Sequence, residues 1–360
     1  SMSISSDTHP NVENKLLTLA PYVSWGWIGA DLYVCGGTKQ QVIPGTLPPT
    51  LTAAAVGVLE SLRSGGLSKA QLTNALRNTD GTETEKRDVI GILTSAHLTM
   101  TEDRDPSDRY DRPKLYYNYA GGNPSETQER ISAAHVAIIG CGGIGNILSS
   151  ALVSSGIGYI TLIDCDTIEE SNLTRQIMFR EADVGLPKID VLARELRNLN
   201  SVTEVRVIHA DITDEDVLAE ALPHCDFAAL SADSPPQIIE WLDRIALRRG
   251  LPYLPVGYVC DMPVIGPMVV PALGSPGWNS GSSFIAKQSS TEHVDRSEHA
   301  PPAPKAKTQA PSHAWTNLVA SGLAVDDILC YLGGFATPVS LNRRIGLNKT
   351  GLYFETQQFD

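Results

Sequence analysis

The sequence predicts an α/β fold with two parts, a winged-helix-like domain followed by a Rossmann-like domain built on a mostly parallel sheet. Between 135 and 249, apolar segments typical of buried strands alternate with amphipathic helical segments, the order that produces a parallel sheet covered on both faces. A glycine-rich segment joins the first of these strands to the first helix. Before them, aromatic strand-like segments and three helical segments occupy residues 1–105. A chain of 360 residues is long enough for two domains of ~150 residues each.

The composition narrows the possible functions. Apolar residues make up 42% of the chain, enough to offset the chain entropy that keeps polar sequences disordered. No apolar run approaches the ~20 residues of a membrane span, so we expect no membrane partner. The formal net charge of −13 repels phosphate backbones, so we expect no nucleic-acid partner. The six cysteines form no C-x-x-C pair and no signal segment opens the chain, which indicates a cytoplasmic protein.

The N-terminal domain is predicted to end near residue 105. Its strands and helices are predicted, in chain order, at 22–28, 32–35, 51–63, 68–77 and 83–98. The strands alternate in polarity beside glycines, and the helices carry apolar residues three to four positions apart. Residues 1–100 contain seven Lys or Arg against eight Asp or Glu, too few cations for a DNA-binding surface. We therefore favour a peptide clamp, which holds an extended peptide with a strand edge and a helix, over a structural appendage or a DNA-binding domain.

The second domain is predicted over 106–360 and begins with a charged arm. Its strands are predicted at 135–140, 159–164, 205–210 and 226–232, and its helices at 143–155, 188–200, 214–222, 235–249 and 315–332. Residues 344–354 are predicted as terminal strands. Residues 274–313 interrupt this pattern and are rich in Ser, Pro, Ala and His. We expect a long flexible loop there, either functional or disordered.

The segment GCGGIG at 140–145 follows a predicted strand and opens a predicted helix, the context in which such glycines bind phosphates. Glycines permit a tight turn and let phosphates approach the N-terminus of the helix. Asp164 ends the next strand, where a carboxylate can accept hydrogen bonds from ribose hydroxyls. Taken alone, these features indicate an NAD-dependent dehydrogenase.

The residues after the second strand indicate a different nucleotide. The run DCDTIEESNLTRQ ends at Gln176, and within it Asn172 and Arg175 would project polar and cationic groups toward the same crevice. Lys188 adds a second cation, and Asp233 places a carboxylate after the fourth strand. This set fits a triphosphate with Mg²⁺, which binds one or two carboxylates together with phosphate oxygens and water. A surface ion pair for Arg175 and a solvated position for Lys188 are the structural alternatives.

Taken in order, GCGGIG, LIDCDTIEESNLTRQ, the helix that begins at Lys188 and the SAD segment at 231–233 resemble the ThiF/MoeB/HesA family, the ancestors of ubiquitin-activating enzymes. The resemblance covers about 130–271. It implies a homodimeric enzyme that uses ATP to adenylate a carboxylate. It also implies that Arg112, in the run RYDR, reaches the nucleotide site of the partner subunit.

The resemblance assigns roles around ATP and Mg²⁺ to two groups of residues. The group expected to act on the phosphates, and so to be catalytic, comprises Arg112, Arg175, Lys188 and the metal ligand Asp233. The group expected to bind the nucleotide comprises Gly140, Gly142, Gly143, Gly145, Asp164, Asp166, Asn172, Gln176 and Ile212. Asp164 would hold the ribose, and Ile212 would flank the adenine.

Two departures from the family pattern bear on zinc and on thioester chemistry. Many members carry two C-x-x-C pairs that bind structural zinc, and here neither the segment after Pro271 nor the end of the chain contains a cysteine. We therefore expect no zinc. Residues 274–313 also lack cysteine, and Cys260 lies in a strand-like run that is expected in the core. Transfer through a thioester is therefore not expected.

The N-terminal domain and the runs SNLTRQIMF, GYVCDMPVIGP and LNRRIG look most like peptide-antibiotic maturation enzymes of the microcin C and pantocin A types. The expected lack of zinc favours the pantocin A type. This resemblance implies a ribosomally made precursor peptide as partner, adenylation of its glutamate side chains, and internal ring closure with loss of water. The alternatives are nucleotidyl transfer to a peptide C-terminus, activation of a sulfur-carrier protein, and a nucleotide-sensing regulator that binds DNA.

Overall fold

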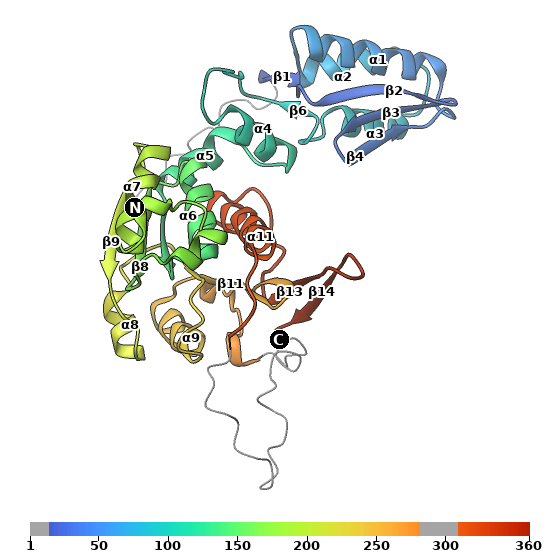
Figure 1. Ribbon diagram of the computed structural model, residues 1–360. Helices are drawn as coiled ribbons and strands as arrows, with labels where there is room; N and C mark the ends of the chain where they lie inside the picture. Colours follow the sequence, from blue (N-terminus) through green and yellow to red (C-terminus); the bar gives the residue numbers. More distant parts are fainter. Residues whose placement is uncertain (1–13, 281–308) are drawn as a thin grey trace, which may run out of the picture. The chain divides into compact units, whose positions relative to one another are not determined.

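The computed structural model describes residues 14–280 and 309–360. The chain divides into two compact units, Ser1–Thr127 and Gln128–Asp360, and helix α5 (Pro124–Ala133) continues from one into the other. The second unit is a mixed α/β layer structure, which confirms the predicted fold class (Figure 1). No helix of the described residues is both long enough and apolar enough to cross a membrane.

The two units divide later in the chain than the predicted boundary at residue 105. The reason is helix α4 (Asp111–Tyr119), which bonds to the first unit. The amide of Asn118 donates to the hydroxyl of Tyr22 over 2.9 Å, and the ring of Tyr119 packs edge-on against Tyr22 with 5.5 Å between centroids. The charged, proline-containing stretch before α4 hides these long-range contacts from any local pattern.

Two small antiparallel sheets and three helices form most of the first unit, with strand orders β5-β1-β6 and β2-β3-β4. The elements are β1 (Leu16–Leu19), β2 (Val23–Ile28), β3 (Asp31–Gly36), β4 (Lys39–Ile43), α1 (Pro49–Ser64), β5 (Leu67–Ser68), α2 (Lys69–Arg77), α3 (Glu83–Leu93) and β6 (Thr99–Met100). Leu59, Leu72 and Val89 bring the three helices into one core. Ser68 and Thr82 form capping boxes, which fix where α2 and α3 begin.

The third helix of this unit is shorter than its predicted range of 83–98. It ends at Leu93, and Leu98 is fully buried in the core of the unit. The chain then pairs Thr99 and Met100 with β1. Burial of Leu98 from a non-helical turn explains why the apolar spacing extended past the end of the helix.

One eight-stranded sheet organises the second unit, in the order β14-β13-β12-β11-β10-β7-β8-β9. Its strands are β7 (His135–Ile139), β8 (Tyr159–Asp164), β9 (Glu204–His209), β10 (Phe227–Leu230), β11 (Tyr253–Val259), β12 (Met262–Ile265), β13 (Arg343–Asn348) and β14 (Tyr353–Gln358). The strands from β9 to β11 are parallel, and those from β11 to β14 pair antiparallel. The chain reverses its direction of travel across the sheet between β7 and β10, and ligands bind at such switch points.

Helices cover both faces of this sheet (Figure 1). The helical elements are α6 (Gly143–Ser154), η2 (Glu170–Thr174), η3 (Glu181–Asp183), α7 (Lys188–Leu199), α8 (Glu215–Ala221), α9 (Ile238–Arg249), η4 (Pro271–Leu273), η5 (Trp278–Ser280) and α11 (Ala314–Gly333). Helix α6 packs against α7 and α11, while α8 packs against α9. Leu218, Leu242 and Ile163 belong to the core that joins α8 and α9 to the sheet. The central strands β7, β8 and β10 are accordingly buried over most of their length, as their continuous apolar sequence predicted.

The segment that follows β11 differs from its prediction. Cys260 is exposed, with φ of +53°, so the expectation that it lies in the core was wrong. Val259 pairs with Met262, which leaves Cys260 and Asp261 as the two-residue turn of a hairpin. Of the loop predicted over 274–313, residues 281–308 lie outside the described residues.

Candidate functional site

Two cavities adjoin at the carboxyl ends of β7 and β10, where the sheet has its switch point. The larger has about 510 Å³ and continues along β11, and the smaller has about 340 Å³ and continues toward β8 and α7. Both are lined by Gly142, Ser231, Ala232, Asp233 and Ile238. The predicted site residues that line one or both cavities are Gly140, Gly142, Gly143, Asp164, Asp166, Arg175, Gln176, Lys188, Ile212 and Asp233. Residues far apart in the sequence therefore meet here.

Close packing explains the glycines of the phosphate loop. Gly140 has φ of +93°, and a Cβ there would lie 2.7 Å from the backbone nitrogen of Ala232. A Cβ on Gly143 would lie 2.4 Å from Oδ1 of Asn317, and a Cβ on Gly145 would lie 2.2 Å from the carbonyl oxygen of Gly140. Gly145 lines neither cavity. It lets helix α6 approach β7, which is the packing role of the third glycine in such loops.

The loop directs the N-terminus of α6 toward the space that the two cavities share. The first N–H groups of a helix lack partners within it, and the helix dipole adds partial positive charge, so this end can bind phosphate oxygens. Buried Asn146 holds the loop in place. Its amide nitrogen donates to the carbonyl oxygens of Cys141 (2.9 Å) and Gly142 (3.0 Å), and its Oδ1 accepts the N–H of Met178 over 3.1 Å.

Asn146 was not predicted as a site residue. Its signal in the sequence is a single amide side chain within the apolar and glycine-rich start of the helix, GIGNIL. A polar side chain on a buried helix requires hydrogen-bond partners. Those partners lie in two loops, and the sequence does not show that the loops meet.

Asp164 is fixed at the end of β8 through both carboxylate oxygens. Its Oδ2 accepts the N–H of Cys141 over 2.7 Å, and its Oδ1 accepts the N–H of Asp166 over 2.8 Å. Each carboxylate oxygen has a further lone pair, so Asp164 can still accept hydroxyl donors from the smaller cavity. Ile212 gives the same cavity an apolar surface that suits a nucleotide base.

Lys188 begins α7 and is only 6% exposed, so the alternative of a solvated residue does not hold. Its ammonium lies 3.3 Å from Oδ2 of Asp166, whose side chain is 61% exposed. A buried ammonium requires anionic or hydrogen-bonding partners. A phosphate group in the smaller cavity would add a second anionic partner beside Asp166.

Arg175 lies against the glycine loop, with its Cγ 3.4 Å from where a Cβ on Gly143 would stand. One guanidinium nitrogen donates to the carbonyl oxygen of Ser171 over 3.1 Å and to the hydroxyl of Thr174 over 3.3 Å. Among the described residues Arg175 makes no ion pair, so the structure does not support the alternative of a surface ion pair. Its other N–H donors remain available to a ligand in the larger cavity.

Asn172 and Gln176 differ in what they face. The Oδ1 of Asn172 accepts the N–H of Glu169 over 2.9 Å, and its side chain shapes the loop without lining either cavity. Gln176 is 3% exposed and lines the larger cavity, and its Oε1 has no partner in the described part of the chain. A buried acceptor left unpaired costs about 1–3 kcal/mol. A ligand N–H or O–H group in the larger cavity would offset that cost.

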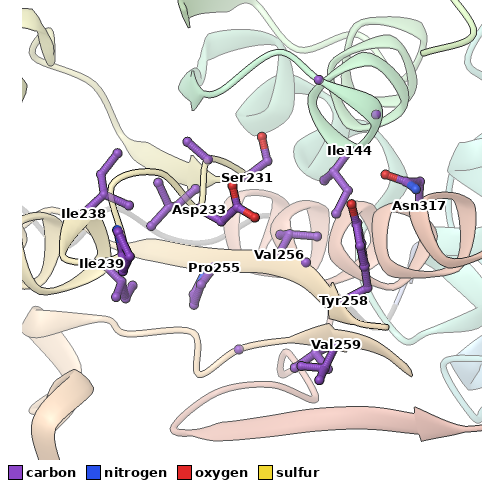
Figure 2. Close-up of a pocket in the computed structure, with 18 of the residues that line it drawn as sticks. Ile144, Ser231, Asp233, Ile238, Ile239, Pro255, Val256, Tyr258, Val259 and Asn317 are labelled. Carbon is purple, nitrogen blue, oxygen red and sulfur yellow. The ribbon is translucent and has the colours of Figure 1, made fainter. Parts of the chain in front are cut away.

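Asp233 lines both cavities with an exposed carboxylate, which Figure 2 shows projecting into the larger one. No hydrogen bond or ion pair engages this carboxylate within residues 14–280 and 309–360. In proteins Mg²⁺ takes such a carboxylate together with water and phosphate oxygens. A carboxylate without a partner in the described part of the chain, beside a helix N-terminus that can bind phosphate, therefore fits the predicted metal.

A second group of possible metal ligands among the described residues is Asp164, Cys165 and Asp166, whose ligand atoms lie within 4.8 Å of one another. Burial, followed by the neighbouring carboxylates of Asp166, Asp211 and Asp164, raises the pKa of the Cys165 thiol to about 11. The thiol is therefore protonated at neutral pH, which does not suit a nucleophile. Each oxygen of Asp164 already accepts one backbone N–H, whereas the carboxylate of Asp233 accepts none among the described residues and lines both cavities, so Asp233 is the better candidate for the metal ligand.

The larger cavity also contains residues for which the sequence predicted no role. Tyr258 on β11 and Asn317 on α11 line it with polar groups, and both are labelled beside Asp233 in Figure 2. Trp278 and Arg344 line it as well. Each comes from a different element, so no spacing in the sequence links them to one another.

Arg112 lies on α4, in the first unit. Its side chain is 86% exposed, and its Nε lies 3.8 Å from the carboxylate of Asp111, a long separation for an ion pair. Exposed ion pairs of this kind contribute little. Arg112 is therefore available to another chain, as a role in the partner subunit requires.

Comparison with known proteins identifies a family match for this chain and similar solved structures. A model of the ThiF family matches residues 118–358. E. coli MccB, solved with ATP, is 31% identical, with a TM-score of 0.80 over 96% of this chain and 97% of that chain. PaaA is 21% identical, with a TM-score of 0.67 over 94% of this chain and 98% of that chain, a likeness that shows the fold alone.

Curated relatives match a shorter part of the chain. The molybdopterin-synthase adenylyltransferase of Haemophilus influenzae is 36% identical over 117 residues, which are 32% of this chain and 47% of that protein. The chain thus spans about half the length of this curated relative. The match to E. coli MccB, in contrast, runs through both units.

Proposed function

The chain belongs to the ThiF family, and from this membership we propose that it uses ATP to adenylate a carboxylate of a ribosomally made precursor peptide. The observation that carries the proposal is the full-length match to E. coli MccB, which has been solved with AMPCPP and MccA, with 31% identity over 96% of this chain. That match includes the N-terminal unit, to which we assign the peptide clamp. It therefore favours a peptide over a sulfur-carrier protein as the substrate.

In the proposed reaction, a carboxylate oxygen of the peptide attacks the α-phosphorus of ATP. A new P–O bond forms, the bond from the α-phosphorus to the bridging oxygen breaks, and pyrophosphate leaves with that electron pair. The products are an acyl adenylate and pyrophosphate. A free carboxylate is a poor electrophile, whereas AMP is a good leaving group, so the step prepares the acyl carbon for attack.

We assign roles in this reaction to residues that line the two cavities and to residues that position them. The backbone N–H groups at the start of α6, with Arg175 and Lys188, would stabilise the charge on the phosphates. Asn172 would position the loop that carries Arg175, and Asp166 would position Lys188 through their ion pair. Catalysis of this kind depends mainly on positioning and charge stabilisation.

The remaining predicted residues would hold the nucleotide, the metal and the peptide. Asp164 would bind the ribose and Ile212 the adenine, while Asp233 would hold Mg²⁺. When bound, Mg²⁺ neutralises charge on the phosphate oxygens. The unpaired Oε1 of Gln176 would accept a donor from whichever ligand occupies the larger cavity.

Two end products are compatible with adenylation. Attack from within the peptide on an activated glutamate would close rings and lose water, which is the outcome that the resemblance to the pantocin A type implies. The greater identity to E. coli MccB, 31% against 21% for PaaA, favours a stable nucleotidyl peptide as the second candidate. The mass of the product separates them, since one reaction removes water and the other adds a nucleotide.

ATP–pyrophosphate exchange tests the first step directly. The assay contains Mg²⁺, with or without a short Glu-containing peptide encoded beside this gene. We expect exchange that depends on the peptide, because pyrophosphate release requires an acceptor carboxylate. Binding of duplex DNA in a salt-sensitive manner, without exchange under either condition, would instead support the nucleotide-sensing regulator.

The proposed homodimer makes a separate prediction for Arg112. Arg112→Ala and Arg175→Ala subunits should each be nearly inactive alone, yet regain activity when they are mixed. In a mixed dimer one site would combine Arg175 from its own chain with Arg112 from the other chain, so that site is complete. Exchange assays before and after subunit mixing measure the recovery. Mixing that restores nothing would contradict the action of Arg112 in trans.

A further inference from the structure

Arg344 is a buried cation in the larger cavity that the proposed reaction does not use. It lies on β13, is 7% exposed and lines the cavity. Its guanidinium lies 4.4 Å from the ring centroid of Trp278 and 6.0 Å from that of Phe359. Within the described residues it has no carboxylate partner, and its buried Nε has no hydrogen-bond partner.

These surroundings leave Arg344 short of an anion. Burial lowers the pKa of Arg344 to about 10, so the side chain still carries its charge at neutral pH. A buried charge without a partner is costly, and the aromatic rings return only about 0.5–2 kcal/mol through cation–π contacts. The rings also leave its Nε–H without an acceptor among the described residues. A carboxylate would match the planar donor fork with two parallel hydrogen bonds.

The order of the strands separates Arg344 from the nucleotide residues. Arg344 precedes Ile345, which pairs with Ile265 on β12, and β12 pairs with β11, which pairs with β10. Three strand spacings of ~4.8 Å place the backbone of Arg344 ~14 Å from β10, the strand that Asp233 follows. Asp164 and Lys188 lie beyond β10, on the side of β7 and β8. Arg344 shares the larger cavity with Arg175 and Asp233 but does not line the smaller cavity, which contains Asp164, Lys188 and Ile212. An anion at Arg344 is therefore attributed to the second substrate and not to the nucleotide.

We propose that Arg344 binds a carboxylate of the peptide substrate other than the one that is adenylated, and so selects which carboxylate reaches ATP. This inference rests on the proposed function. The second carboxylate is either the C-terminal group of the peptide or an acidic side chain close to the reacting residue. Arg344 is in either case a specificity-determining residue, and its loss should affect peptide recognition more than use of ATP.

Arg344→Gln and Arg344→Lys test the role of the charge, and Arg343→Gln is the matched control. Arg343 is the adjacent residue on β13, donates to the carbonyl oxygen of Val339 and does not line the cavity. In ATP–pyrophosphate exchange with the encoded peptide, Arg344→Gln should raise the KM for peptide ~10- to 100-fold, the size expected for a lost charged hydrogen bond. The KM for ATP should stay near that of the parent enzyme. Arg344→Lys should recover part of the loss, and Arg343→Gln should show none.

Altered peptides identify the source of the carboxylate. One peptide carries a C-terminal amide, and the others carry Gln or Asn in place of single acidic residues. With the parent enzyme and with Arg343→Gln, one altered peptide should have a KM ~10- to 100-fold above that of the encoded peptide. With Arg344→Gln, the same altered peptide should have the same KM as the encoded peptide. If Arg344→Gln does not fold, the same comparison is made between the parent enzyme and Arg344→Lys.

Three outcomes would decide against the inference. Equal KM values for every peptide with the parent enzyme would overturn it, as would an Arg344 variant that raises the KM for ATP or pyrophosphate instead. If Arg343→Gln raised the KM for peptide as much as Arg344→Gln does, the effect would be explained by a change in the stability of β13. If the parent enzyme shows no peptide-dependent exchange at all, the proposed function itself fails. That result differs from peptide-dependent exchange that is unchanged by substitution of Arg344.

Discussion

Asp233→Asn is expected to lower ATP–pyrophosphate exchange by ~10²-fold or more, the size of effect seen when one group that stabilises transition-state charge is removed. Asp233 follows β10, lines both cavities, and has no bonding partner among the described residues. The substitution keeps the size of the side chain and removes only its charge. The Tm should therefore be unchanged. The loss should appear as a weaker dependence of the exchange rate on Mg²⁺ concentration.

Exchange rates measured across a range of Mg²⁺ concentrations, together with Tm, check this prediction. Asp216→Asn is the control, because Asp216 is an exposed carboxylate in the first turn of α8 and lines neither cavity. Near-normal exchange in Asp233→Asn would remove Asp233 from the role of metal ligand. A fall in Tm with a loss of all activity would indicate damage to the fold instead.

Arg175→Ala is expected to lower exchange by ~10²- to 10³-fold, again because a preorganised charge group is lost. Arg175 lies against the glycine loop, and among the described residues its side chain donates to Ser171 and Thr174, both in the adjoining η2. Since these hydrogen bonds are exposed, their loss should leave Tm nearly unchanged. Arg175→Lys should retain part of the activity, because it keeps the charge but not the planar fork of donors.

Steady-state exchange with ATP and peptide varied separately provides the measurement. Arg180→Ala is the matched control. Arg180 is an exposed arginine in the same part of the chain, bonds to the carbonyl oxygens of Ile177 and Phe179, and lines neither cavity. Activity in Arg175→Ala comparable to that of Arg180→Ala would show that Arg175 does not act on the phosphates.

Local patterns in the sequence predicted most of the second unit. The alternation of apolar strands and amphipathic helices was confirmed from β7 to α9, with ends that differ by only a few residues. The glycine loop and the cavity-lining residues Asp164, Lys188 and Asp233 could be predicted because each lies at or just beyond the end of a strand or at the start of a helix. The ends of strands and the starts of helices depend on residues close in sequence, so the spacing of apolar residues and glycines predicts them.

The glycine run at 140–145 and the run at 164–176 did not reveal which way each side chain faces. Asn172 and Gln176 are four residues apart, yet Asn172 caps its loop while Gln176 lines the larger cavity. Gly145 belongs to the glycine run and yet packs a helix against a strand. The direction of these side chains depends on the backbone conformation of the loop after β8, and that conformation is held by Asn146 through its bond to Met178.

The sequence by itself determined the α/β class of the second unit, the glycine loop and most of the predicted site residues that line the two cavities. Only the tertiary structure decided where the N-terminal unit ends, that Cys260 lies in a turn, and that Tyr258, Trp278, Asn317 and Arg344 line one cavity. The first group follows from hydrophobic periodicity and turn chemistry, which act between near neighbours. The second follows from strand pairing and helix packing between segments far apart in the chain, and no local spacing encodes those contacts.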